Sequence, residues 1–330
     1  MNQESRKLKV ATIGGGGGHS ALVSVLKNFP ISLTALCNTV DDGGSSGRLR
    51  REYGVHDQGD VRGVLSALAG DRGKELGYRF QGGSLQGHTV GNILLTSFEL
   101  NLGSQQAAID RIRDWYGIHN RVAPMTNNNP VLHARTTDDQ EVVGQSAIVK
   151  YLWSTDVAHI EAIWVDPADE PLSAIARDAL QEADYIIVAM GDLYSSIAPS
   201  FCLTELKELL PKSKAKVIWL PNAVAPKSHV HYETTTKVLS FLQTLSPGFQ
   251  PDMIVAHSAE VAHSTEKVLQ DRGYRVSTMD LEPSAKMKIL REDLLDATYL
   301  REKTVGDNIE RSPVRYDLKK LKKIFEKILV

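Results

Sequence analysis

The sequence has few of the features that mark secreted, membrane-bound or nucleic-acid-binding proteins. Its 330 residues include two cysteines, Cys37 and Cys202, which lie far apart in apolar runs, so buried free thiols in a reducing compartment are expected. No apolar run approaches membrane-spanning length, and the polar first residues do not resemble a signal peptide. The formal net charge is -2, which gives no overall field for nucleic acid. We therefore expect a cytoplasmic protein that binds neither membranes nor nucleic acids.

The composition and the order of patterns indicate one α/β domain. Apolar residues make up 42% and charged residues 24%, as in ordinary globular proteins. Apolar strands alternate with helical patterns, which predicts a mainly parallel sheet wrapped by helices. One of the predicted helices runs from about Ser195 to Leu210. Between residues 122 and 165 the period of the apolar pattern shortens. We interpret this as an inserted β region with short strands at 131–134, 142–143 and 147–152. Without repeats or low-complexity linkers, residues 1–330 are expected to form a single domain.

A run of glycines follows the first predicted strand and precedes a helical pattern. Such a loop directs backbone N–H groups and a helix N-terminus at a diphosphate, so Gly15, Gly16, Gly17 and Gly18 are candidate phosphate contacts. His19 stands where the third glycine of the dinucleotide fingerprint would fall. The alternative is a tight turn between strand and helix.

The segment after the second predicted strand carries two adjacent carboxylates, Asp41 and Asp42. They repel each other unless a cation or donor hydroxyls lie between them. An NAD-binding enzyme usually has an acidic residue at the end of this strand, where Asn38 stands here. The carboxylates are therefore better suited to a metal, a sugar or a base, and the alternative is a solvated turn.

The same segment continues with Ser45, Ser46 and Arg48, which are candidate contacts for an anion. If a helix begins after Ser46, Arg48 and Arg51 share one face and Arg50 points elsewhere. At least one of these arginines could then belong to a surface salt bridge instead.

Further candidate site residues lie at the start of two later predicted helices. Asp60 and Arg62 lie at the start of one, where Asp60 is either a ligand contact or a helix cap. His88 and Asn92 are one helical turn apart, so both can face one pocket. For His88, a polar contact with the ligand is favoured over catalysis.

The second half of the site is expected where later strands end. Gly191, Asp192, Tyr194 and Ser195 follow an apolar strand, and Asn222 follows the next one. Open parallel sheets bind ligands at this edge. His229 and His231 lack the neighbours of a zinc site and are interpreted as surface residues. A C-terminal helix with Leu318, Leu321, Phe325 and Ile328 on one face is expected to dock on the core.

At this point the sequence resembles the family that joins the phospholactate transferase CofD to the YvcK-type gluconeogenesis factors. The resemblance rests on six segments that cover most of the chain: 14–18, 40–50, 59–62, 78–80, 87–92 and 193–197. The amino-acid sequence of the second segment is similar to that of the YvcK branch. The family implies a Rossmann-like three-layer fold with a mainly parallel sheet.

The YvcK-like branch implies a cytoplasmic protein that binds nucleotide sugars of the uridine diphosphate type and is linked to carbon metabolism, cell wall and cell shape. The transferase branch implies a magnesium-dependent transfer. The shared motif makes Asp41, Asp42 and Asn92 the expected ligand or metal contacts. The chain departs from the family pattern at Asp192 and at residues 223–229, which predicts an altered edge in the second half of the site.

The leading hypothesis is a regulator that binds a nucleotide-diphosphate small molecule, with no cofactor assigned. No nucleophile–base pair stands out in the sequence, so no catalytic residue is assigned and binding is favoured over turnover. The alternative is a Mg-dependent transferase of the CofD type, in which Asp41 and Asp42 would hold the metal. A weaker alternative is an NAD-dependent oxidoreductase. Whether the protein forms a homo-oligomer is left open.

Overall fold

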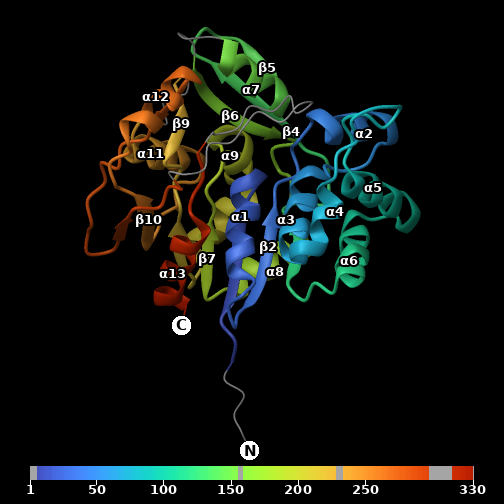
Figure 1. The fold of residues 1–330 in the computed structure, drawn as a ribbon, viewed down its shortest axis with the longest axis horizontal. Helices are drawn as coiled ribbons and strands as arrows, with labels where there is room; N and C mark the ends of the chain where they lie inside the picture. The colour runs from blue at the N-terminus through green and yellow to red at the C-terminus, as the bar shows by residue number, and fades with distance from the viewer. Residues whose placement is uncertain (1–5, 155–158, 228–232, 297–313, 330) are drawn as a thin grey trace, which may run out of the picture.

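The computed structural model describes residues 6–154, 159–227, 233–296 and 314–329. A seven-stranded parallel sheet runs through it in the order β12-β10-β8-β7-β1-β2-β3 (Figure 1). Its strands are β1 (Lys9–Gly14), β2 (Ser32–Cys37), β3 (Arg121–Pro124), β7 (Tyr185–Val188), β8 (Lys216–Trp219), β10 (Met253–His257) and β12 (Lys288–Glu292). The predicted α/β architecture with a mainly parallel sheet is confirmed.

Two hydrophobic cores, one on each face of the sheet, make the fold three-layered. Along β1, Val10 belongs to one core, whereas Ala11 and Ile13 belong to the other, because successive side chains of a strand point to opposite faces. The first core contains α1 (Gly16–Leu26), α3 (Gly59–Ala69), α6 (Gln105–Tyr116) and α13 (Leu318–Leu329). The second contains α8 (Ala174–Glu182), α9 (Ala198–Cys202) and α11 (Thr235–Leu245).

The remaining helices lie around these layers. They are α2 (Gly44–Tyr53), α4 (Lys74–Gly77), α5 (Val90–Leu102), α7 (Gln145–Ser154), α10 (Thr204–Leu209) and α12 (His263–Asp271). A two-stranded antiparallel sheet pairs β9 (Val224–Pro226) with β11 (Tyr274–Val276). Among the described residues, no helix combines the length and the apolar character needed to cross a bilayer.

A small antiparallel sheet interrupts the alternation of strands and helices. It has the order β5-β4-β6, from β4 (Val131–Thr136), β5 (Glu141–Val143) and β6 (Ile160–Asp166). The strand predicted at 147–152 is wrong, because these residues belong to α7. Ile148 and Leu152 are four residues apart and both buried, so the apolar pattern has a helical period. In Figure 1 this sheet and α7 lie above the carboxyl ends of β1 and β2.

Two further helix predictions can be compared with the structure. The single helix expected from about Ser195 to Leu210 is instead a wide helical turn at Leu193–Ile197, then α9 and α10. Leu203 is extended (φ -68°, ψ 122°) and separates α9 from α10. The C-terminal helix docks as expected, beside α1, with Leu321 and Phe325 fully buried, although Leu318 is 41% exposed (Figure 1).

Candidate functional site

The carboxyl ends of β1, β2 and β7 meet where the strand order reverses. β1 pairs with β2 on one side and with β7 on the other, although β2 and β3 come before β7 in the chain. In open α/β sheets, ligands bind in the crevice at such a switch point. The glycine loop leaves β1, the segment with Asp41 leaves β2, and the segment with Gly191 leaves β7. The structure therefore brings three predicted segments to one edge of the sheet.

The glycine loop makes a close turn from β1 into α1. Gly15 is the extended N-cap of α1, and Gly16 has a φ of +63°, which a side chain would strain. A Cβ on Gly18 would overlap the backbone carbonyl of Met190 after β7, so this glycine allows α1 to pack closely. Gly17 is exposed and has open space beside it.

His19, which replaces the third glycine of the fingerprint, points inward. Its Nε2 lies 2.8 Å from the Thr12 hydroxyl, and the side chain is fully buried. Burial lowers the pKa of His19 to about 4, so the imidazole is neutral at physiological pH. His19 is therefore a packing residue beneath the loop and contributes no positive charge to it.

Asp60 reaches from α3 to the glycine loop. Its Oδ1 accepts a hydrogen bond of 2.6 Å from Gly16 N, and a Cβ on Gly15 would overlap its Oδ2. The N-cap of α3 is Gln58, and no side chain caps this helix. The residue thus contacts the loop instead of capping its own helix, and it places a carboxylate at the first amide of α1.

Two carboxylates and a hydroxyl surround Gly59 at the start of α3. A Cβ at Gly59 would lie 2.8 Å from Asp41 Oδ2, 2.8 Å from Ser46 Oγ and 3.3 Å from Asp57 Oδ1. Backbone amides support the pair, because Gly43 N donates to Asp41 Oδ1 (2.9 Å) and Gly59 N donates to Asp57 Oδ1 (2.7 Å).

Burial is the main reason that the pKa values of both carboxyl groups are raised. It raises the pKa of Asp41, and it raises the pKa of Asp57 well above its usual range, with the charges of Asp41 and Asp60 adding to the shift at Asp57. Asp57 Oδ2 is buried and has no hydrogen-bond partner among the described residues. A buried carboxylate oxygen of this kind is a potential ligand for a cation.

The donor set around Gly59 suits a hard cation. In the described part of the chain, no group of three or more His, Cys, Asp or Glu side chains could hold a metal. Asp41 and Asp57 supply carboxylate oxygens and Ser46 a hydroxyl, all within 3.3 Å of the point where a Gly59 Cβ would lie. Mg²⁺ is often held by one or two carboxylates, with water and substrate phosphates completing its shell. These residues fit Mg²⁺ and lack the nitrogen and sulfur ligands that zinc prefers.

Asp42 points to a different place from Asp41. Its Oδ1 accepts a hydrogen bond of 2.8 Å from Ser146 N at the start of α7, and its Oδ2 lies close to Gly144. Next to Ser146, Gln145 Nε2 donates to Ser195 O (3.1 Å). The side chain of Asp42 thus holds the α7 segment over the site, and the carboxylate that faces Asp41 is Asp57.

A hydrogen-bonded chain links α2, α3 and α5. Arg62 Nε donates to Asn92 Oδ1 (3.3 Å), Asn92 Nδ2 donates to Ser45 Oγ (3.1 Å), and Ser45 Oγ lies 2.9 Å from His88 Nδ1. Burial lowers the pKa of His88, and the charges of Arg48 and Arg79 lower it further. In one of the two neutral tautomers, Nδ1 accepts the Ser45 proton and Nε2 carries the imidazole proton. The structure thus brings four predicted site residues together.

The segment after β7 is ordered by its own side chains. Asp192 Oδ1 accepts hydrogen bonds from Ser195 N (2.9 Å) and Ser195 Oγ (2.8 Å), and Asn222 Nδ2 donates to Gly191 O (2.6 Å). Tyr194 is fully buried and packs edge-on against Phe241, in the core. Asp192, Ser195 and Asn222 thus lie at the sheet edge, whereas the Tyr194 ring does not.

The edge expected to differ at residues 223–229 is largely buried. Ala223 is buried, and Val224 to Pro226 form β9, which pairs with β11. Residues 228 and 229 lie outside the described residues, and so does His231.

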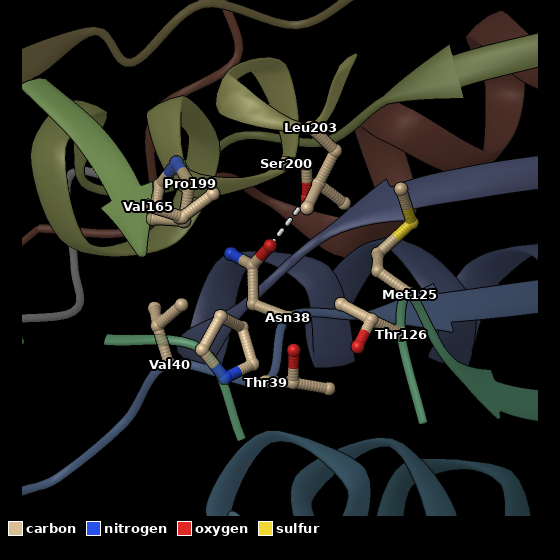
Figure 2. Close-up of a pocket in the computed structure, with 10 residues that line it drawn as sticks. Asn38, Thr39, Val40, Met125, Thr126, Val165, Pro199, Ser200 and Leu203 are labelled. Carbon is tan, nitrogen blue, oxygen red and sulfur yellow. Dashed lines mark hydrogen bonds between the residues drawn. The ribbon is translucent and has the colours of Figure 1, made fainter. Parts of the chain in front are cut away.

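Asn38, at the end of β2, is held by the helical segment after β7. Its Nδ2 donates to Ser196 O. Its Oδ1 accepts a hydrogen bond from Ser200 Oγ, which Figure 2 shows as a dashed line. A small cavity adjoins this contact between β2, β3 and α9, lined also by Thr39 and Thr126. With its amide engaged on both sides, Asn38 does not offer the acidic group that NAD-binding proteins use at this position.

Comparison with known proteins identifies the family. The family model described as 2-phospho-L-lactate transferase CofD matches residues 10–295. The chain belongs to this family. The resemblance expected from the motifs is thereby confirmed.

Several similar curated proteins carry the name gluconeogenesis factor or putative gluconeogenesis factor. The chain is 31% identical over 297 residues to the gluconeogenesis factor of Bacillus subtilis, covering 88% of this chain and 92% of that protein. It is 30% identical over 328 residues to the putative gluconeogenesis factor of Thermotoga maritima, covering 97% and 99%. A crystal structure of a UPF0052 family member from Bacillus halodurans superposes with a TM-score of 0.84 at 25% identity, covering 97% and 99%. The YvcK-like assignment is therefore supported by names as well as by fold.

Some residues of the candidate site were not predicted from the sequence. Asp57 lies among the Asp41 and Asp60 carboxylates, and Arg79 lies beside His88. Ser146 joins the site from the inserted region through Asp42. Asp57 stands three residues before Asp60 in a polar, glycine-containing stretch, which is a weak signal. Nothing in the sequence indicates Ser146.

Proposed function

We propose that the protein binds a nucleotide diphosphate-linked sugar of the UDP-sugar type at the switch point between β1 and β7. The observation that carries the proposal is the convergence of the glycine loop with the carboxylate and hydroxyl side chains of residues 41–48 at one edge of the sheet. The N-terminus of α1 favours a diphosphate, and carboxylates accept hydrogen bonds from sugar hydroxyls. Asn222 and Ser195 would face the ligand from the β7 and β8 side.

The engagement of Asn38 argues against an NAD-dependent oxidoreductase. Its amide is bound by Ser196 and Ser200, so the end of β2 has no carboxylate for the adenosine ribose. Asp41 and Asp57 lie farther along the chain and face Gly59. This arrangement suits a sugar, a base or a metal better than the ribose of NAD.

A regulatory role in carbon metabolism, cell wall and cell shape, in the cytoplasm, follows from the resemblance to YvcK-type proteins. It is supported by the gluconeogenesis factor names of relatives that align over most of this chain. In such a role the bound nucleotide sugar would act as a signal, and turnover is not required.

A second candidate is a Mg-dependent transferase of the CofD type. The observation that favours it is the Asp41–Asp57 pair around Gly59, with an unpartnered buried oxygen on Asp57. A cation held there would neutralise phosphate charge during transfer. The hydrogen bond between Ser45 and His88 adds a hydroxyl–imidazole pair that the sequence alone did not reveal.

Calorimetry separates these functions. The protein would be titrated with UDP-glucose, UDP-N-acetylglucosamine, GDP and NAD, each with and without Mg²⁺. Binding of a UDP-sugar regardless of Mg²⁺ supports the regulator. Binding of a nucleotide diphosphate that requires Mg²⁺ supports the transferase.

Two variants test whether the UDP-sugar binds at the proposed site. Asp41→Asn should weaken UDP-sugar binding at least tenfold, whereas Asp71→Asn, an exposed aspartate paired with Lys74, should leave it unchanged. Binding of NAD alone, or equal affinity in both variants and the wild type, would refute the proposed site.

A further inference from the structure

Two arginines converge beside His88 at the N-terminus of α5. Arg48 donates from α2 to Gln86 O (2.7 Å), and Arg79 donates to Gly87 O (2.6 Å). The two carbonyl groups belong to neighbouring residues, so both guanidinium groups contact one short stretch of backbone. Arg48 Nη2 lies 3.0 Å from the point where a Gly87 Cβ would be, beside the carbonyl that accepts from Arg79, and the charges of both arginines act on His88.

The backbone around this cluster is well defined. Residues 78–90 fold back on themselves, with Phe80 N donating to His88 O (3.0 Å) and Gly87 N donating to Phe80 O (2.8 Å). Arg79 forms an antiparallel bridge with Thr89, the N-cap of α5. Arg79 is thereby fixed next to the positive end of a 13-residue helix.

The two arginines leave the cluster with a net positive charge, because one carboxylate, Glu52, acts on it. Among the described residues, neither Arg48 nor Arg79 forms an ion pair, and each is partly exposed. Glu52 is the carboxylate whose charge acts on His88, and it lies one helical turn after Arg48 on the same face of α2, where it is exposed. Two guanidinium groups close together repel each other, and a bound anion removes the repulsion.

His88 completes the donor set. Its Nδ1 is occupied by Ser45, which in turn accepts from Asn92; in the tautomer in which Nδ1 accepts the Ser45 proton, the imidazole proton lies on Nε2. The remaining N–H groups of the arginines and the Nε2–H of His88 are hydrogen-bond donors, as a phosphate group requires.

We propose that Arg48, Arg79 and His88 form a phosphate subsite, separate from the diphosphate position on the glycine loop. The protein would thus bind a second, phosphate-bearing molecule beside the nucleotide sugar; this pairing rests on the proposed function. The hydrogen-bonded chain from His88 through Asn92 to Arg62 connects the subsite to α3, which carries Asp60 to the glycine loop. The two ligands would lie on either side of the α3 N-terminus.

The test is calorimetry with inorganic phosphate, with and without saturating UDP-glucose. Phosphate should bind the wild-type protein in both conditions. Arg48→Gln and Arg79→Gln should each weaken phosphate binding about tenfold or more, and Arg79→Gln, which lies outside the residues assigned to the nucleotide sugar, should leave UDP-glucose affinity unchanged. Arg111→Gln is the matched control, because Arg111 is exposed and its guanidinium lies over Phe98 on another surface. Glycerol 3-phosphate in parallel distinguishes a phosphate monoester from free phosphate as the preferred source.

Several results would overturn the subsite. They are absence of phosphate binding at millimolar concentration, equal affinity in the wild type and both arginine variants, and competition between phosphate and UDP-glucose. If Arg79→Gln does not fold, Arg48→Gln carries the test, because Arg48 projects from the partly exposed side of α2. Arginine-dependent phosphate binding without any UDP-glucose binding would support the subsite and refute the proposed function.

Discussion

Asp57 provides a direct test of the carboxylate cluster. Asp57 and Asp41 both lie within 3.3 Å of the point where a Gly59 Cβ would be, and Asp57 is fully buried. At a separation of about 5 Å and an effective dielectric constant of about 20, two carboxylates repel each other by about 3 kcal/mol. Asp57→Asn keeps the shape and the hydrogen bond from Gly59 N but removes the charge. We expect it to raise the free energy of unfolding by about 1–3 kcal/mol at pH 8.

The direction of the pKa shift of Asp57 determines how the stability difference between the two proteins changes with pH. Burial, followed by the charges of Asp41 and Asp60, raises the pKa of Asp57 well above its usual range. The folded state therefore holds this proton more tightly than the unfolded state. The wild type should lose stability relative to Asp57→Asn as the pH rises from about 4, the unfolded value, through the folded pKa. Below about pH 4 the two proteins should be equally stable.

Urea unfolding of both proteins at pH 4, 6 and 8 measures this difference, with Asp71→Asn as the exposed control. Mg²⁺ adds a second readout. If the cation binds between Asp41 and Asp57, 10 mM Mg²⁺ with a Kd of about 1 mM stabilises the wild type by about 1.4 kcal/mol and leaves Asp57→Asn unchanged. A variant less stable than the wild type at pH 8, or a difference that does not depend on pH, would refute the reasoning.

Two further predictions concern packing and a second buried carboxylate. Gly18→Ala should destabilise the protein by about 2 kcal/mol or more in thermal unfolding, because its Cβ would overlap the Met190 carbonyl, whereas Gly17→Ala has open space and should be tolerated. Glu99→Gln should lower the free energy of unfolding in urea by about 1–3 kcal/mol, because Glu99 Oε1 accepts from His56 N (3.0 Å) and contacts His56 Nδ1 (2.5 Å). Glu99 raises the pKa of His56, so this difference should be largest below about pH 6.5 and should shrink as the pH rises through the folded pKa; a constant difference would contradict the ion pair.

Local sequence signals predicted the elements that depend on short-range physics. The glycine loop between β1 and α1 follows from an apolar strand, flexible glycines and a helical pattern, all within about 20 residues. Six motif segments together indicated the family, and the segment that contains Asp41 favoured the YvcK branch. The error at residues 147–152 arose because a short apolar run fits both the period of a strand and the period of a helix. The burial of Ile148 and Leu152, four residues apart, corresponds to the helix.

The residues that contact the Asp41 segment could not be predicted from its local sequence, because they come from other parts of the chain. The sequence placed Asp41 and Asp42 side by side, but the fold separates them: Asp41 faces Asp57, and Asp42 turns to Ser146, 104 residues away. In the same way Ser45 meets His88, and Asp60 meets Gly16, through helix packing. The sequence by itself determined the α/β class, the family and the residue types of the site. Tertiary structure alone decided which charges meet, because carboxylates and guanidinium groups act over a few ångströms in space, whatever their separation along the chain.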